Sequence, residues 1–143
     1  MSRILIVDDE PANVLLLETI LSDIGTEIRS LTDSRQVELK FEAFEPDIVL
    51  LDLHMPEPDG LEILRRLSGL RSQMFVPVVV LTADSTKIAR QSALVLGADD
   101  FLTKPFDQFE VRLRVRNLLR TRALYVELSD ARAALEHRLG KQE

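Results

Sequence analysis

Three short runs of the chain are apolar at every position, and the segments between them have the spacing of amphipathic helices. The runs occupy residues 4–7, 48–51 and 78–81. A strand that is apolar throughout must be covered on both faces, which is typical of a parallel sheet between two layers of helices. The alternation of such runs with helical segments therefore predicts an α/β fold with a central parallel sheet.

Turn and cap residues mark where the expected elements begin and end. We expect strands at residues 3–7, 27–31, 47–51, 78–81 and 100–103. Pro11 suits the first turn of a helix that ends at Gly25, because proline is favoured there and glycine ends helices. The other helix boundaries carry similar signals: Asp59 and Gly60, Asp84 and Ser85, Gly97, and Asp107, near which the last helix begins without a terminator before Gly140.

The length and composition limit what the chain can be. Its 143 residues, 45% of them hydrophobic, can enclose one core and are too few for two ordinary domains. The longest apolar runs fall far short of the roughly 20 residues that cross a bilayer, and no charged-then-apolar leader precedes them. Because cysteine is absent as well, we expect a soluble cytoplasmic protein with no membrane contact.

Charge is distributed unevenly along the chain. Residues 1–110 contain 10 Lys and Arg against 20 Asp and Glu, whereas residues 111–143 contain 8 against 4. The acidic body repels nucleic acid phosphates, and the arginines of the basic tail are spread around a helix rather than set among aromatic residues. We therefore expect no direct binding of nucleic acid.

Acidic residues follow the expected strands where a ligand site is expected. In an open α/β sheet the ligand crevice lies beyond the carboxyl ends of the strands, and Asp8, Asp9 and Asp52 stand at two of these ends. Two unit charges about 5 Å apart repel by roughly 3 kcal/mol at an effective dielectric near 20, so three carboxylates need a cation. Mg²⁺, or Mn²⁺ in its place, takes such oxygen ligands. Thr82 and Lys104, at two further strand ends, are a hydroxyl and an ammonium, the types of group that would complete a metal site suited to phosphoryl transfer.

Four segments closely resemble the receiver domains of two-component response regulators. They are ILIVDDE at residues 4–10, IVLLDLHMPEPDG at 48–60, VVVLTA at 78–83 and GADDFLTKPF at 97–106, in the family's order and spacing. The resemblance covers residues 3–122. It implies a flavodoxin-like, doubly wound, five-stranded parallel sheet of order 2-1-3-4-5, with residues 1–122 as the receiver domain and residues 123–143 as a helical extension.

The resemblance also implies a role for each site residue. Asp52 is then the phosphoacceptor, and Asp8, Asp9 and the backbone carbonyl of His54 join Asp52 in binding the metal. Thr82 is the switch hydroxyl and Lys104 contacts the phosphoryl group. The remaining implied features are Phe101, the aromatic that changes rotamer when Thr82 moves, and a cis peptide bond between Lys104 and Pro105. The phosphoryl donor is a sensor histidine kinase or a phosphotransfer protein, and the chain is a switch rather than an enzyme.

Each residue taken alone has an ordinary explanation. Asp8 and Asp9 ahead of a proline could cap a helix, Thr82 could be a β-branched strand residue, and Phe101 could belong to the core. Their joint placement at the ends of four strands argues against a purely structural account. His54 is a position at which the family varies, and its side chain either acts on the phosphorylated site or matters only through its backbone carbonyl.

Two competing functions remain from the sequence. A Mg²⁺-dependent phosphohydrolase of the aspartyl-phosphate type also places an acid after a strand, but it needs a second acid two residues later, where this chain has His54. A degenerate receiver would serve only as a protein-docking module, although every phosphorylation residue is present here. Reaction with a small phosphodonor separates these two from the phosphoacceptor switch. The switch would be stably modified, a phosphohydrolase would turn the donor over rapidly, and a docking module would not react.

The end of the chain has the pattern of a helix longer than the domain needs. Leu124, Leu128, Ala131 and Leu135 follow a four-three-four spacing that places them on one stripe. A helix that packs on this sheet needs about 12 to 15 residues at 1.5 Å each. We therefore expect a continuous helix from about residue 113 to 139 that projects beyond the domain. It serves for coiled-coil dimerisation or as a linker to an output domain, with a frayed end as the alternative.

Overall fold

A five-stranded parallel sheet between two layers of helices forms the body of the computed structural model, which describes residues 2–24, 27–70, 75–83 and 86–141. The elements follow in the order β1 (Arg3–Val7), α1 (Pro11–Leu21), β2 (Glu27–Leu31), the 3₁₀ turn η1 (Ser34–Gln36), α2 (Val37–Phe44), β3 (Ile48–Asp52), α3 (Gly60–Leu70), β4 (Val78–Thr82), α4 (Lys87–Val95), β5 (Asp100–Thr103) and α5 (Gln108–Lys141). The strand order is 2-1-3-4-5 and all pairs are parallel. The predicted flavodoxin-like sheet is confirmed.

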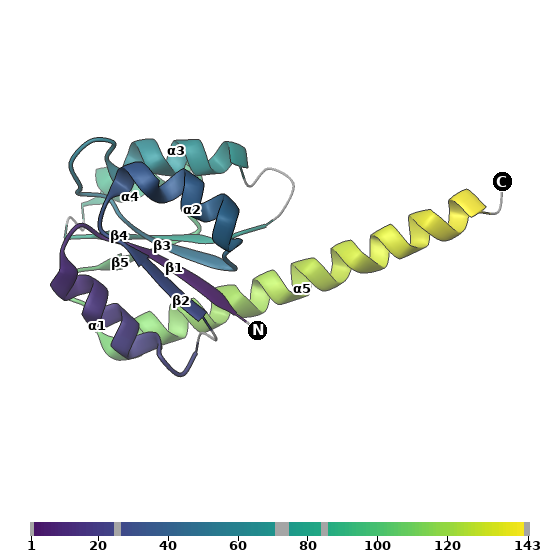
Figure 1. Ribbon diagram of the computed structural model, residues 1–143, viewed down its shortest axis with the longest axis horizontal. Coiled ribbons are helices and arrows are strands. Elements are labelled where there is room, and N and C mark those ends of the chain that lie inside the picture. Colours follow the sequence, from purple (N-terminus) through teal and green to yellow (C-terminus); the bar gives the residue numbers. More distant parts are fainter. Residues whose placement is uncertain (1, 25–26, 71–74, 84–85, 142–143) are drawn as a thin grey trace.

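Successive residues of the central strands point to opposite layers. Leu5, Val7 and the matching residues of β3 and β4 pack with α2, α3 and α4, whereas Ile4 and Ile6 belong to the cluster that includes α1 and α5. Figure 1 shows these two groups of helices on opposite sides of the sheet. Every residue of β3 and β4 is buried, which is why those segments are apolar almost throughout.

The element boundaries differ from the expected ones in a few places. β3 extends through Asp52 and β4 through Thr82, so both polar residues are the last residues of their strands. α1 ends at Leu21. The expected helix end at Gly25 and the expected helix start at Asp84 and Ser85 lie outside the described residues. Thr86 caps α4 instead, with its Oγ1 accepting a hydrogen bond from the backbone N–H of Ala89 at 3.3 Å.

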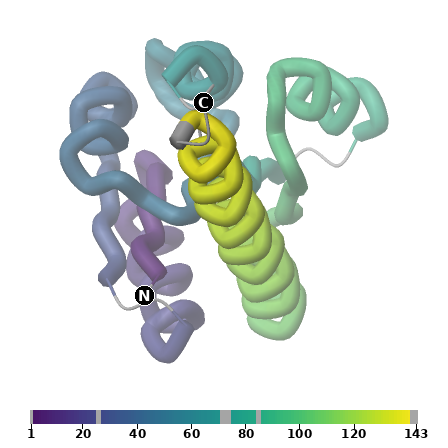
Figure 2. The backbone as a smooth tube through the Cα atoms, turned by 90° about the vertical axis from the view of Figure 1, so that its right-hand side faces the viewer, coloured from purple at the N-terminus to yellow at the C-terminus, as the bar shows by residue number. Residues whose placement is uncertain are grey.

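The helix α5 is much longer than the body that it covers. Its N-terminal part buries Val111 and Val115 against the sheet, and its residues 127–140 are all exposed. Figure 1 shows the helix leaving the domain, and Figure 2, seen from the side toward which it projects, shows its C-terminal half in front of the body. The predicted projecting helix is confirmed. None of the helices within the described residues is long and apolar enough to cross a membrane.

Candidate metal and phosphoacceptor site

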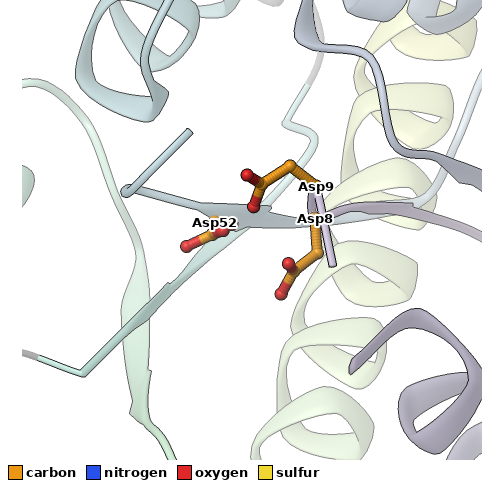
Figure 3. A group of neighbouring side chains, drawn as sticks. All are labelled: Asp8, Asp9 and Asp52. Atoms are coloured by element: carbon orange, nitrogen blue, oxygen red, sulfur yellow. The ribbon is translucent and has the colours of Figure 1, made fainter. Parts of the chain in front are cut away.

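Three aspartates meet at the carboxyl ends of β1 and β3 (Figure 3). The two strands are neighbours with Val7 beside Leu51, so the residues that follow, Asp8 and Asp52, come next to each other. The side chain of Asp8 is fully buried and Asp52 is 1% exposed, whereas Asp9 is half-buried. The register of the sheet therefore brings together the carboxylates that the sequence placed at separate strand ends.

The chemistry of this donor set fits a divalent cation. One oxygen of each aspartate lies within 4.8 Å of those of the other two. Asp8 Oδ1 accepts a hydrogen bond from the N–H of Glu10 at 3.0 Å, and Oδ2 of Asp8 has an ion-pair contact with Lys104 Nζ at 3.2 Å, but Oδ2 of Asp52 accepts no hydrogen bond from the described residues. Buried carboxylate oxygens without donors are costly unless a cation supplies the missing charge. A hard cation such as Mg²⁺, which takes oxygen ligands, would satisfy them.

Lys104 contributes the positive charge of the site. Its Nζ lies 3.2 Å from Asp8 Oδ2 and 3.2 Å from Asp52 Oδ1, and the side chain is mostly buried. The residue follows β5, and its backbone N–H donates to the carbonyl of Thr82 at 2.8 Å. The peptide bond between Lys104 and Pro105 is cis, as predicted. A second cis bond, between Glu57 and Pro58, was not predicted from the sequence.

Burial and charge shift the protonation of this group of residues. Burial raises the pKa of Asp52, and the nearby carboxylate of Asp8 adds to this, while the N–H of His54 and the ammonium of Lys104 lower it, for a final pKa of about 6. Burial alone would lower the pKa of Lys104, but the carboxylates of Asp52 and Asp8 raise it above its ordinary value. Lys104 therefore stays protonated, and Asp52 is a carboxylate at neutral pH.

His54 connects the acid to the hydroxyl at the end of β4. Its backbone N–H donates to Asp52 Oδ1 at 3.1 Å, and its side-chain Nε2 lies 3.1 Å from the Oγ1 of Thr82, which is 3% exposed. The imidazole therefore faces the Thr82 hydroxyl, and a role of this side chain at the phosphorylated site stays a prediction. The sequence alone could not predict this contact, because it joins two strand ends 28 residues apart.

Phe101, in β5, lies half-buried against the core beside α4. The guanidinium of Arg90 stands over its ring, 4.5 Å from the ring centroid, and this stacking contact was not anticipated from the sequence. No spacing signal could have revealed Arg90, because an arginine on a helix is ordinarily a solvated surface charge.

The sequence matches the family described as response regulator receiver domain over residues 4–116, which is most of the chain. The chain belongs to the response regulator receiver family. Members of this family accept a phosphoryl group on an aspartate and control an output domain, so they are phosphoacceptor switches rather than enzymes that act on a separate substrate. The predicted family is thereby confirmed.

Curated relatives support the same assignment. The transcriptional regulatory protein TrcR of Mycobacterium tuberculosis is 41% identical over 118 residues, which cover 82% of this chain and 45% of TrcR. The alkaline phosphatase synthesis transcriptional regulatory protein PhoP of Bacillus subtilis is 36% identical, over 82% of this chain and 48% of PhoP. The receiver chain thus spans about half the length of these relatives.

Solved structures share the fold of this receiver domain. NtrX from Brucella abortus superimposes with a TM-score of 0.82 at 32% identity, covering 91% of this chain and 29% of NtrX. The receiver domain of DrrB, activated with BeF₃, gives a TM-score of 0.75 at 28% identity over 84% of this chain and 98% of that domain. The chemotaxis protein CheY4 of Vibrio cholerae gives 0.74 at 26% identity, over 83% of this chain and 98% of CheY4.

Proposed function

We propose that this receiver domain accepts a phosphoryl group on Asp52 from a sensor histidine kinase or a phosphotransfer protein. The single observation that carries the assignment is the position of Lys104 Nζ, which lies 3.2 Å from both Asp8 and Asp52. Asp52 is buried at the end of a strand, with a second acid and an ammonium group beside it, and phosphoryl transfer requires these parts.

We further propose that Mg²⁺, or Mn²⁺, is bound by Asp8, Asp9, Asp52 and the backbone carbonyl of His54. The bound cation would neutralise charge on the phosphoryl oxygens. In the transfer, a carboxylate oxygen of Asp52 forms the new bond to phosphorus while the bond between phosphorus and the donor breaks. Above a pH of about 6 Asp52 is ionised and can act as the nucleophile, and Lys104 stands where it can contact a phosphoryl oxygen.

Treatment with acetyl phosphate and Mg²⁺ tests the phosphoacceptor. We expect a single adduct on Asp52, detected by mass spectrometry of peptides, and no comparable modification of Asp52→Asn. Modification of Asp52→Asn at an unchanged rate would show that another residue is the acceptor. A chelator, or the variant Asp9→Asn, should slow the reaction by orders of magnitude, since the negative charge is then uncompensated. Modification that is equally fast without metal would contradict the cation site.

Phosphorylation is proposed to act through Thr82 and Phe101. Oxygens of the phosphoryl group would draw the Thr82 hydroxyl into a charge-assisted hydrogen bond, for which Thr82 must give up its contact with His54. Phe101 would then move inward, away from the guanidinium of Arg90. Structures with and without beryllofluoride test this step, and an unmoved Phe101 ring and Thr82 hydroxyl would contradict it.

The stability of the acyl phosphate separates this proposal from its alternatives. We propose that the domain itself catalyses both its phosphorylation and the slow hydrolysis of the product. Loss of labelled phosphate after removal of the donor measures that hydrolysis directly. Rapid turnover would favour a phosphohydrolase, and absence of any reaction would favour a docking module. The sequence argues against the phosphohydrolase, because such an enzyme needs an acid two residues after Asp52, where this chain has His54.

Two further proposals concern partners and location. The relatives TrcR and PhoP are named transcriptional regulators, which supports a cytoplasmic site of action for this chain. Its acidic body argues against direct contact with nucleic acid.

We also propose that residues 123–143 pair with the same segment of a second copy. Sedimentation equilibrium of the whole chain and of a version ending at Arg122 tests the pairing. Only the whole chain should dimerise at micromolar concentration. If both versions are monomeric, the pairing is refuted.

A further inference from the structure

We propose that the exposed half of α5 forms a parallel, in-register, two-stranded coiled coil with a second copy of the chain, and that the two receiver domains lie on its outer sides. The inference rests on the pairing proposed above and adds its orientation and register. It is carried by three observations on the described residues: an exposed leucine stripe, the direction in which that stripe faces, and the charges beside it.

The leucine stripe consists of Leu124, Leu128, Ala131 and Leu135. Its three leucines are 56%, 72% and 57% exposed, in chain order. The helix is held to the body just before the stripe, because the buried guanidinium of Arg122 donates to Asp47 Oδ1 at 2.8 Å. The stripe therefore continues a fixed helix and cannot turn back onto the sheet. A second copy of the helix can cover it.

The stripe faces away from the receiver domain. The residues of α5 that face the sheet include Val111, Val115 and Arg122. At 3.6 residues per turn, the centre of the leucine stripe lies about 150° around the helix from the centre of this inner face. A second helix that packs on the stripe would approach from the outer side of α5. The two receiver domains would then lie on opposite outer sides of the paired helices and would not collide.

The charges beside the stripe favour parallel pairing. The four-three-four spacing makes Leu124 and Ala131 d positions and Leu128 and Leu135 a positions, so Glu127 falls at g and Arg132 at e. In a parallel coiled coil the g position of one helix faces the following e position of the other. Glu127 would then face the partner's Arg132, and the twofold symmetry would repeat this pair.

Antiparallel pairing would lose these contacts. In that arrangement g positions face g positions, so Glu127 would meet either a second Glu127 or the alanine at position 134. Arg132 already makes an ion pair with Glu136 of its own helix, with Nε at 3.1 Å from Oε1 and with the arginine side chain 82% exposed. Such a surface pair is weak, so Arg132 can also bond to a partner at little cost.

The same pattern predicts weak pairing. Ala131 buries little surface, and the next d position is Arg138. Two heptads with one alanine give a marginal coiled coil, so the dimer should form in the micromolar range and dissociate on dilution.

Disulfide formation in the full chain tests the orientation, because the sequence contains no cysteine. In a parallel, in-register pair, position 138 of one helix faces position 138 of the other. Arg138→Cys should therefore form a covalent dimer under mild oxidation. The matched control is Ala133→Cys, which is exposed but on the opposite side of the helix, and it should remain monomeric. A cross-link that forms instead between Arg138→Cys and Thr121→Cys in a mixture would show antiparallel pairing and overturn the proposal.

Charge reversal tests the register. Glu127→Arg alone and Arg132→Glu alone should each weaken dimerisation, roughly tenfold in dissociation constant, since two attractions become two repulsions. The double variant, and an equimolar mixture of the two single variants, should restore it. Equal dissociation constants for all of these would overturn the proposed register. A chain that stays monomeric at high micromolar concentration would refute the pairing itself, whereas phosphorylation of Asp52 is measured separately and is unaffected by that result.

Discussion

Among the residues of this receiver domain, Asp52, the proposed phosphoacceptor, is a buried acid that must be charged to react. Its side chain is 1% exposed, and burial raises its pKa to about 6. The ammonium of Lys104 and the N–H of His54 offset only part of that cost. The proposed phosphoacceptor is therefore also a source of instability while no cation is bound.

The replacement Asp52→Asn should stabilise the metal-free domain at neutral pH. An acid whose pKa is raised on folding favours the folded state at low pH, and this contribution is lost as the pH rises from the unfolded value near 3.8 through about 6. A difference of roughly two pKa units corresponds to about 3 kcal/mol. Denaturant unfolding with a chelator should show Asp52→Asn more stable than the natural chain at pH 7.5, by an amount that shrinks toward pH 4.5. A difference that does not change with pH would contradict the raised pKa.

At the level of elements, the junction of β3 and α3 leaves no room for a side chain at Gly60. A Cβ at this position would lie 2.2 Å from the carbonyl oxygen of Asp52 and 2.4 Å from the Cα of Leu53. We expect Gly60→Ala to reduce the free energy of unfolding by roughly 3 kcal/mol, because the obstacle is backbone and cannot rotate away. Phosphorylation should also slow, since the displaced peptide carries Asp52, the proposed phosphoacceptor.

Gly69→Ala in the same helix is the matched control. Nothing lies within 4 Å of the Cβ that it would add, and a helical glycine costs roughly 0.5 to 1 kcal/mol relative to alanine. This variant should therefore be as stable as the natural chain or more so in the same denaturant titration. Similar stability of the two variants would mean that the close approach at Gly60 does not matter.

A buried ion pair ties the helix α5 to the residue that precedes β3. Arg122 Nε donates to Asp47 Oδ1 at 2.8 Å, and another nitrogen of the guanidinium donates to the carbonyl of Phe75. Breaking a fully buried pair typically costs 3 to 5 kcal/mol. Asp47 is 23% exposed and keeps a bond from the N–H of Arg3, so we expect Arg122→Met to cost about 2 kcal/mol.

The exposed neighbour Arg120 supplies the control for this prediction. Arg120→Met should change the free energy of unfolding by less than about 0.5 kcal/mol, as surface substitutions usually do. Hydrogen exchange of the amides near Arg122 provides a second measurement, and it should quicken in Arg122→Met alone. Equal effects of the two substitutions would contradict the role of the buried pair.

At the scale of the whole molecule, the body and the exposed half of α5 are energetically separate. All residues from 127 to 140 are exposed, so they bury no core surface within one chain. Deleting residues 127–143 should therefore change the unfolding free energy by less than about 0.5 kcal/mol at concentrations where the chain is monomeric. The rate of phosphorylation by acetyl phosphate should not change either. A large loss of stability would mean that the segment packs on the body.

The sequence by itself determined most of the architecture. Strands apolar on both faces can be stable only inside a parallel sheet covered by helices, which is why their positions and the crevice at their carboxyl ends were predictable. Asp8, Asp52 and Lys104 were predictable for the same reason, because strand ends define that crevice. The helix α2 was not assigned from the sequence. Gln36 makes no side-chain cap bond, and Glu45 takes the left-handed conformation where a glycine would have marked the end.

Only the tertiary structure decided which side chains meet across elements. The contact of His54 with Thr82 joins residues 28 apart, and that of Arg122 with Asp47 joins residues 75 apart. Such contacts depend on the register of the sheet and on the direction in which each helix crosses it, and neither follows from the local pattern of a segment. Local periodicity identifies a residue's element and face, whereas its partners are set by the packing of the whole chain.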